Sequence, residues 1–354
     1  MKDQTNLLRA RSEKAHQTAS LQSKSEITVC DSREYRFPPI KLSKLKWFTE
    51  KDLPPEVIVL DFERLLKNQD LDLLAKTLTG EKILVLKNHP ITEQELEDIV
   101  NVTRQFFDQK EEDRRKMIHP RLSRLIRGFS GFNSEHMVSI DYDAKRDGIA
   151  DPILKYSWGP EDNLYPNEKF KQIWDNYFKK CYFISTTLIE KIIDILDLKK
   201  DPQWKKMFNG DGTVRLACYP EVENVTSDRF KLHLDMGFIT LNNQLPSENG
   251  FTCLQVEHDA KLISVPAVKN LLVVNYNEHL GLFTNNRVKP VVHQVISPPR
   301  EEVKDSERSS VLFFLHPHDD LITKNPKESG LKQCYSEGSQ TKFSDFMRRW
   351  LDLI

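Results

Sequence analysis

The stretch from Thr213 to His316 constrains the fold of this chain more than any other part of the sequence. It is a succession of short runs rich in β-branched and aromatic residues, separated by turn residues, which is typical of an antiparallel β structure. We expect strands at 213–219, 238–241, 251–256, 262–265, 271–275, 291–295 and 311–315. Side chains with metal-binding and anion-binding chemistry stand between and within these runs.

Two potential metal ligands follow the first run. His233 and Asp235 are separated by one residue, and on a β-strand residues i and i+2 point to the same face. His293 lies 58 positions beyond Asp235 (293 − 235) and would supply a third ligand. Two histidines and one carboxylate leave about half of an octahedral shell open, which suits Fe(II) that must also bind oxygen and a co-substrate. His-x-Asp also arises by accident, so spacing alone leaves ordinary surface or core histidines open as the alternative.

The same i, i+2 spacing recurs at Arg308 and Ser310. A planar guanidinium beside a hydroxyl suits one end of a carboxylate. The structural alternative is that Arg308 is a surface cation near Asp305 and Glu307. The apolar run at 311–315 favours an inward direction for Arg308 and Ser310 together.

In this order, the motifs resemble the catalytic core of the 2-oxoglutarate- and Fe(II)-dependent oxygenases of the isopenicillin N synthase-like family. The matching segments are Arg215 to Pro220 (Arg-x-Asn-x-Tyr-Pro in the family), His233 to Thr240 (His-x-Asp-x-Gly-x-x-Thr), Gly250 to Val256, Leu271 to Asn275, Thr284 to Arg287, Val291 to Pro298 and Ser306 to Leu315. Two features depart from the family pattern. Ala217 occupies a position where the family often has asparagine, and the gap from His293 to Arg308 is longer than usual. We expect the charged insertion at 300–307 to be a surface loop.

The resemblance implies a mixed α and β fold, with a double-stranded β-helix (jelly-roll) core flanked by helices and an N-terminal strand-helix region. We expect a mobile polar tail at 1–34, a strand and helix region with loops over the site at 35–200, the jelly-roll oxygenase core at 201–325 and a C-terminal helical segment at 326–354. The residues themselves predict strands at 56–62 and 82–89, a helix at 71–78, a helix capped by Thr92 and Glu95, and a long helix that begins at Pro166.

The resemblance also implies cofactors and chemistry. Fe(II) would be bound by the two histidines and the aspartate, with no catalytic residue beyond this metal centre. Arg308 and Ser310, with Tyr219, would hold the co-substrate 2-oxoglutarate. Dioxygen would be the other co-substrate, and a small-molecule C–H bond would be oxidised by hydroxylation, oxidative cyclisation or desaturation, with release of succinate and carbon dioxide. Secondary metabolism is the setting expected for the family.

The segment 119–166 lacks clear periodicity and is broken by glycines and prolines, and long irregular segments are often functional loops. The resemblance implies that it runs over the mouth of the metal site. Its predicted substrate contacts are Arg127, Phe129, Tyr142 and Trp158, with packing as the alternative role of each. The cluster of ligand types at 316–320 is interpreted as a surface loop.

Composition narrows the class of partner. The 354 residues include 52 Lys and Arg and 53 Asp and Glu, so no nucleic-acid partner is indicated. The five cysteines form no C-x-x-C pair, which favours free thiols in the cytoplasm over a zinc site or disulfides. No apolar run reaches the roughly 18 residues of a membrane span, so no membrane partner is expected. We expect a small-molecule substrate and a monomer, with a homodimer left open.

Two other functions remain open at this point. The chain could be an oxidase of the same fold that uses no 2-oxoglutarate, as isopenicillin N synthase does, with Arg308 and Ser310 holding a substrate carboxylate. It could also be a non-enzymatic binding module, although an intact set of three ligands argues against that interpretation.

Overall fold

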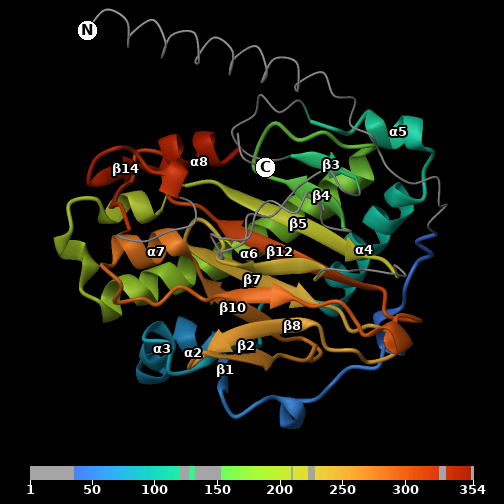
Figure 1. The fold of residues 1–354 in the computed structure, drawn as a ribbon, viewed down its shortest axis with the longest axis horizontal. Coiled ribbons are helices and arrows are strands. Elements are labelled where there is room, and N and C mark those ends of the chain that lie inside the picture. Colours follow the sequence, from blue (N-terminus) through green and yellow to red (C-terminus); the bar gives the residue numbers. More distant parts are fainter. Residues whose placement is uncertain are drawn as a thin grey trace, which may run out of the picture. The chain divides into compact units, whose positions relative to one another are not determined.

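The computed structural model describes residues 36–119, 127–131, 153–208, 210–221, 228–326 and 332–351. Within them, two β-sheets enclose a cavity, and helices cover the outer face of the larger sheet (Figure 1). The predicted tail and the predicted substrate contact Tyr142 lie outside the described residues.

The larger sheet contains eight of the described strands, in the order β1-β2-β10-β7-β12-β5-β4-β3. Their bounds are β1 Val57–Asp61, β2 Ile83–Lys87, β10 Leu272–Tyr276, β7 Ile239–Gln244, β12 Arg308–Leu315, β5 Gly212–Tyr219, β4 Leu154–Trp158 and β3 Gly128–Ser130. Neighbours are antiparallel, except β1 and β2, which are parallel. Strands from the N-terminal region therefore extend the sheet at both edges.

The smaller sheet contains four described strands, in the order β6-β11-β8-β9. Their bounds are β6 Phe230–His233, β11 His293–Val295, β8 Leu254–His258 and β9 Lys261–Ser264. A separate pair consists of β13 Ile322–Lys324 and β14 Gln340–Lys342.

The long helix α6 (Glu168–Ile195) packs against β5, β12 and β7, with α3 (Leu71–Leu78) and α4 (Glu93–Phe107) beside it (Figure 1). The other described helices are α2 Phe62–Leu66, α5 Glu111–Arg115, α7 Glu278–Phe283 and α8 Phe343–Leu351, with 3-10 turns η1 Leu42–Lys44, η2 Glu50–Asp52, η3 Leu198–Lys200, η4 Trp204–Met207, η5 Arg300–Glu302 and η6 Lys332–Cys334. None of these helices combines the length and the apolar character needed to cross a membrane.

Strand β12 shows how the sheet separates helix packing from the site. Phe313 points to the helices, where its ring centroid lies 5.5 Å from that of Phe178 on α6. Ser310, Leu312 and Phe314 line the cavity on the opposite face. Because successive strand residues alternate between faces, one strand serves both the core and the site.

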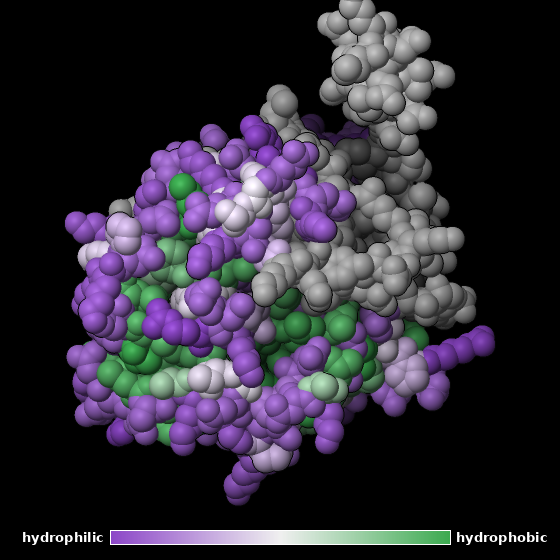
Figure 2. All heavy atoms as spheres, turned by 60° about the vertical axis from the view of Figure 1, so that its left-hand side comes forward, coloured by the Kyte–Doolittle hydropathy of each residue, from purple (hydrophilic) through white to green (hydrophobic). Residues whose placement is uncertain are grey.

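On the molecular face shown in Figure 2, polar residues cover most of the surface, and apolar residues show mainly in its recesses.

Several local predictions are confirmed. Helix α3 has the predicted bounds, and α4 begins with a capping box in which Thr92 accepts from the backbone N–H of Glu95 while Glu95 accepts from that of Thr92. Helix α6 begins slightly later than predicted, after Asn167, whose side chain accepts from the backbone N–H of Phe170. Strand β7 extends three residues beyond its predicted end, to Gln244, because its polar residues are paired on both sides in the sheet.

The prediction that 119–166 is irregular is wrong for two segments, β3 and β4, which pair with each other. All five residues of β4 are buried, so this strand lacks the alternation that identifies a half-exposed strand. The four described cysteines, Cys181, Cys218, Cys253 and Cys334, are buried free thiols, as predicted, and Cys30 lies outside the described residues.

Candidate metal centre and its cavity

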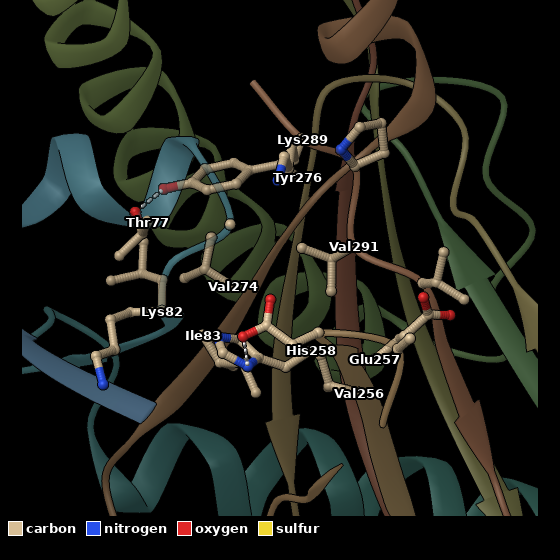
Figure 3. A pocket seen from close by; sticks show the side chains of 16 residues that line it. Thr77, Lys82, Ile83, Val256, Glu257, His258, Val274, Tyr276, Lys289 and Val291 are labelled. Carbon is tan, nitrogen blue, oxygen red and sulfur yellow. Dashed lines mark hydrogen bonds and ion pairs between the residues drawn. The ribbon is translucent and has the colours of Figure 1, made fainter. Parts of the chain in front are cut away.

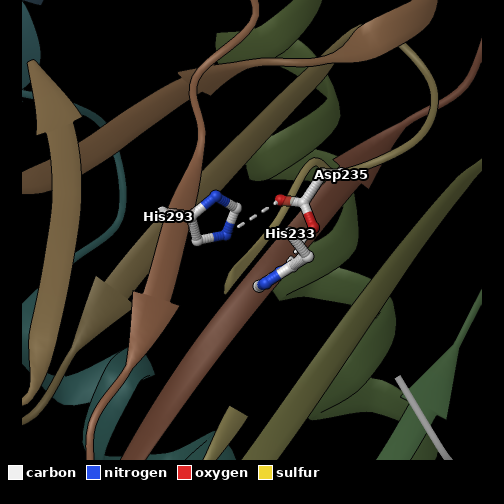
Figure 4. A group of neighbouring side chains, drawn as sticks. All are labelled: His233, Asp235 and His293. Carbon is white, nitrogen blue, oxygen red and sulfur yellow. Dashed lines mark ion pairs between the residues drawn. The ribbon is translucent and has the colours of Figure 1, made fainter. Parts of the chain in front are cut away.

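Three side chains converge at the small sheet. His233 ends β6, His293 begins β11, and the two residues are partners in the antiparallel register. The Nε2 atom of His233 lies 3.4 Å from Oδ1 of Asp235, and the Nε2 atom of His293 lies 3.6 Å from Oδ2 (Figure 4). One ligand atom from each residue lies within 4.8 Å of the others, and no other such group occurs among the described residues.

The other ring nitrogens fix the tautomers of both histidines. Nδ1 of His233 lies 2.7 Å from the carbonyl oxygen of Lys231, and Nδ1 of His293 lies 3.1 Å from that of Val291. A carbonyl oxygen only accepts, so in the neutral imidazoles each Nδ1 carries the proton and donates it. Each Nε2 therefore keeps its lone pair on the side that faces Asp235.

Asp235 is oriented by neutral hydrogen-bond partners. The hydroxyl of Thr240 donates to Oδ2 of Asp235 at 2.7 Å, and Asn277 donates to the Thr240 oxygen at 3.1 Å. Burial alone would raise the pKa of Asp235, but His293, His233 and the Thr240 hydroxyl outweigh it and hold the pKa below its usual value. The carboxylate is therefore ionised at neutral pH.

Burial lowers the pKa of His293 to about 4, and the neighbouring His233 adds to this shift. The His293 ring is therefore neutral near pH 7, as metal binding requires.

The chain turns after Asp235 at Gly237, where φ is +88° and a Cβ atom would lie 2.6 Å from the carbonyl oxygen of Leu315. Only glycine fits this turn without displacing β12.

Two imidazoles with free Nε2 lone pairs and one carboxylate form the donor set of non-haem Fe(II) sites that keep open positions. All three residues are buried, so their side chains are held by the surrounding protein. The residues present therefore fit Fe(II).

The predicted co-substrate residues lie together on the larger sheet. Tyr219 and Ser310 line the same cavity as the metal ligands, while Arg308 lies next to it. Arg308 pairs with Tyr219 in the β5–β12 register, and its Cζ lies 5.2 Å from the centroid of the Tyr219 ring. Its guanidinium donates to the Ser310 hydroxyl and to Sγ of Cys253. The guanidinium thus reaches the edge of the cavity through Ser310.

One hydrogen-bond donor of the Arg308 guanidinium is not used by these contacts. The Nε atom of Arg308 is buried and has no hydrogen-bond partner among the described residues. Arg229, which is 3% exposed, adds a second buried guanidinium near Arg308 and Cys253 and donates to the hydroxyl and carbonyl oxygens of Ser306. Positive charge and a spare donor fit the far carboxylate of 2-oxoglutarate.

Sequence reasoning gave no role to two cations of the cavity wall, Lys155 on β4 and Arg215 on β5. Lys155 was missed because β4 was missed, and because a buried lysine is rare. Arg215 did carry a signal, since it lies four residues from Tyr219 on one strand and therefore on the same face.

The structure describes three of the four predicted substrate contacts, and it places them away from this cavity. Arg127 pairs with Asp211 at 2.8 Å, while Phe129 packs on Phe106 and Trp158 packs in the aromatic core. None of these three is among the residues that line the cavity, and their contacts are those of packing and an ion pair, the alternative role left open for each.

A second, wider pocket lies elsewhere and is lined by residues of β2, β8 and β10 (Figure 3). The hydroxyls of Thr77 and Tyr276 lie 2.7 Å apart there, and Nε2 of His258 lies 3.0 Å from the carbonyl oxygen of Glu81. Among the described residues that line this pocket, no group of three metal-binding side chains occurs. In the predicted surface loop 316–320, His316 is buried, whereas His318 is 41% exposed at its side chain.

Comparison with known proteins agrees with this chemistry. A model of the 2OG-Fe(II) oxygenase superfamily matches residues 210–317, a range that contains the three metal-ligand residues, Arg308 and Ser310. The chain is 29% identical over 314 residues to the α-ketoglutarate-dependent kainoid synthase of Pseudo-nitzschia multiseries, which covers 84% of this chain and 83% of the synthase. It is 28% identical over 227 residues to deacetoxycephalosporin C synthase of Amycolatopsis lactamdurans, an alignment that covers 63% of this chain and 71% of that synthase.

Among solved structures, a full-length protein of Neurospora crassa in complex with α-ketoglutarate (2-oxoglutarate) superposes with a TM-score of 0.67 at 22% identity, over 86% of this chain and 98% of the Neurospora chain. This likeness confirms the predicted jelly-roll fold with flanking helices. The family match and the curated relatives support the 2-oxoglutarate-dependent enzyme over the other two functions left open, with Fe(II) as cofactor and dioxygen as co-substrate. Residues 210–317 thus match the superfamily of 2-oxoglutarate- and Fe(II)-dependent oxygenases, and the chain is an enzyme of this kind.

Proposed function

We propose that His233, Asp235 and His293 bind the iron of this oxygenase. The observation that carries the proposal is the approach of three ligand atoms, from the end of β6, the turn after it and the start of β11, to within 4.8 Å of one another. When bound, iron and 2-oxoglutarate supply with dioxygen the oxidant that removes a hydrogen atom from the substrate, and the co-substrate leaves as succinate and carbon dioxide. The protein contributes orientation, because Thr240 and backbone carbonyls hold each ligand in place.

Arg308 and Ser310, with Tyr219, bind the far carboxylate of 2-oxoglutarate in this proposal. The spare Nε donor of Arg308 supports this role, and so does the position of Ser310 and Tyr219 on the wall across from the histidines. Binding by a fixed fork orients the other end of the co-substrate toward the metal. The cluster of apolar residues that includes Ile153 and Val295 limits water around it.

The substrate is a small molecule, and the oxidation of one of its C–H bonds is the reaction we propose. The names of the relatives, a kainoid synthase and a deacetoxycephalosporin C synthase, support a biosynthetic role in secondary metabolism. Hydroxylation, oxidative cyclisation and desaturation use the same ligands, so the position of the substrate determines the outcome. We further propose that the protein is a monomer in the cytoplasm and has no nucleic-acid or membrane partner.

Anaerobic titration tests this assignment. Protein loaded with Fe(II) should develop a weak visible metal-to-ligand band on addition of 2-oxoglutarate, and it should release succinate under air. Asp235→Asn should weaken iron binding at least about tenfold and abolish the band. A folded wild-type protein that shows neither band nor succinate would contradict the proposal.

The chain offers a matched control at Asp259. An Asp259 oxygen lies 3.6 Å from Nδ1 of His258, a separation equal to that between Asp235 and His293, but the Asp259 side chain is 87% exposed and forms no group of three ligands with other described residues. Asp259→Asn should leave the band and the iron affinity unchanged. Substrate conversion in buffer free of 2-oxoglutarate would instead favour the alternative function, an oxidase of the same fold that uses no 2-oxoglutarate.

A further inference from the structure

A second arginine lies at the end of the site where the proposed function places the far carboxylate of 2-oxoglutarate. Arg229 directly precedes β6 and is 3% exposed, and sequence reasoning gave it no role. Building on the proposed function, we propose that Arg229 and Arg308 bind this carboxylate together, as an arginine clamp that joins the two sheets. The clamp makes the site selective for 2-oxo acids that carry a second carboxylate.

The two arginines approach one cysteine from different sheets. In the smaller sheet, Phe230 on β6 and Leu254 on β8 have the same partner residue on β11. Arg229 and Cys253 come just before these two residues, so they lie at the same end of that sheet. Arg308 begins β12 in the larger sheet, and its Nη1 atom lies 2.7 Å from Sγ of Cys253. Arg308 and Cys253 are both electrostatic neighbours of Arg229, so the two guanidiniums converge between the sheets.

Among the described residues, no carboxylate compensates these two charges. Nη2 of Arg229 donates to the hydroxyl of Ser306 at 2.8 Å and to its carbonyl oxygen at 2.9 Å, and both acceptors are neutral. Glu307, the acid next to Arg308 in the sequence, pairs with Arg104 instead. Two buried charges of the same sign that lie near each other are unfavourable unless an anion accompanies them. The arrangement therefore favours a bound anion between the two arginines.

Each guanidinium also has an unused donor. Nε of Arg308 and Nη1 of Arg229 are buried and have no hydrogen-bond partner among the described residues. Because buried polar groups are nearly always satisfied, both donors point to a ligand. A carboxylate offers about four acceptor positions on its two oxygens, which is enough for both arginines and for the hydroxyl of Ser310. One far carboxylate can therefore satisfy both guanidiniums at once.

Calorimetric titration of anaerobic protein loaded with Fe(II) tests the clamp. The probes are 2-oxoglutarate and 2-oxopentanoate, which has the same carbon chain with a methyl group in place of the far carboxylate. Arg229→Gln should raise the Kd of 2-oxoglutarate about 10- to 150-fold, as for the loss of a charge-assisted hydrogen bond, and leave the Kd of 2-oxopentanoate within about twofold. A merely structural role would weaken both ligands alike. Arg229→Lys keeps the charge without the planar fork, so its affinity should lie between those of the wild type and Arg229→Gln.

A double-mutant cycle tests whether the two arginines share one carboxylate. Residues that contact the same group are energetically coupled, so the losses from Arg229→Gln and Arg308→Lys should not simply multiply. The Kd of the double variant should depart from the product of the two single effects by about fivefold or more, in either direction. Independent losses would place the two guanidiniums on separate anions and would overturn the clamp.

Arg287→Gln is the matched control, because Arg287 also donates to carbonyl oxygens but lies in the turn after α7, away from Arg308. It should bind both 2-oxo acids as the wild type does. Unchanged 2-oxoglutarate affinity in Arg229→Gln, or an equal loss for both 2-oxo acids, would overturn the proposal and leave the assignment of Arg308 standing. A wild type that binds no 2-oxoglutarate would remove the proposed function as well.

Ser306→Ala keeps the proposal testable if Arg229→Gln fails to fold. Ser306 holds the Arg229 guanidinium through two contacts, and alanine removes only the one from the hydroxyl. This variant should weaken the binding of 2-oxoglutarate about threefold or more and leave the binding of 2-oxopentanoate unchanged. Wild-type affinity for 2-oxoglutarate in Ser306→Ala would then count as the overturning result.

Discussion

Replacement of Arg308 by lysine tests the co-substrate site. Arg308 is 4% exposed, and its Nη1 atom lies 2.7 Å from Sγ of Cys253 while Nη2 donates to the Ser310 hydroxyl. Its buried Nε atom has no partner among the described residues and is available to a carboxylate. Lysine keeps the positive charge but loses the planar fork, so it cannot make these contacts together.

The expected loss follows from the contacts. A charge-assisted hydrogen bond in a buried site contributes about 1.5 to 3 kcal/mol, which corresponds to a dissociation constant for 2-oxoglutarate raised about 10- to 150-fold. Ser310→Ala removes a neutral donor and should cost about 1 kcal/mol, roughly fivefold in affinity. Arg308→Lys should therefore weaken the binding of 2-oxoglutarate more than Ser310→Ala does.

The assay is anaerobic titration of the Fe(II) protein with 2-oxoglutarate, followed by the visible band. Arg287→Lys is the control, because Arg287 donates to the carbonyl oxygens of Thr284 and Leu196 and does not line the cavity. Its affinity should equal that of the wild type. An Arg308→Lys protein that stays folded and binds 2-oxoglutarate within twofold of the wild type would refute the role of Arg308.

Three further predictions concern the support of the site and the stability of the fold. Thr240→Val removes the hydroxyl that donates to Asp235 at 2.7 Å and should weaken iron binding about 10- to 100-fold, whereas Thr240→Ser should restore it; equal iron titrations of wild type and valine variant would contradict this. Burial lowers the pKa of His279 to about 3, so the unfolded chain takes up a proton first as pH falls below about 6.5, and stability is lost from there downward. Wild type should lose about 2 kcal/mol more than His279→Gln between pH 7 and pH 5 in urea unfolding, and parallel losses would exclude this source. Burial would raise the pKa of Glu95, but hydrogen bonds from Lys180 and from Thr92 at the helix cap outweigh burial and lower the pKa to about 2. The ionised Glu95 therefore stabilises the folded state above about pH 4.5, and this contribution fades toward pH 2. Glu95→Gln should therefore be about 1 kcal/mol less stable than wild type at pH 7, with the gap narrowing at pH 3; a gap that stays constant would contradict the linkage.

The three candidate metal ligands could be picked out from the sequence in part because two of them follow a local rule. The spacing of His233 and Asp235 places both on one side of the chain, and His293 lies in a run of its own with strong β character. What the sequence could not supply is register. Only the pairing of β6 with β11 places His293 opposite His233, and long-range pairing of this kind has no local signature.

The part of the cavity wall that β4 forms was not predicted, for a related reason. Strand β4 is buried on both faces, so its pattern did not alternate, and Lys155 within it looked like an ordinary solvated lysine. Trp158, a predicted substrate contact in the same region, packs in the core, which is the alternative role left open for it. Which aromatic side chains face a core and which face a cavity depends on the sheet order, which the sequence does not encode locally.

The central claim is that the three ligands share one iron next to a bound 2-oxoglutarate. A crystal structure of the anaerobic complex with Fe(II) and 2-oxoglutarate tests it directly, with the iron located by its anomalous scattering. The account predicts a single peak within bonding distance of Nε2 of His233, Nε2 of His293 and a carboxylate oxygen of Asp235, with the far carboxylate of 2-oxoglutarate on Arg308. An iron bound elsewhere, or coordinated by only one of these side chains, would contradict it.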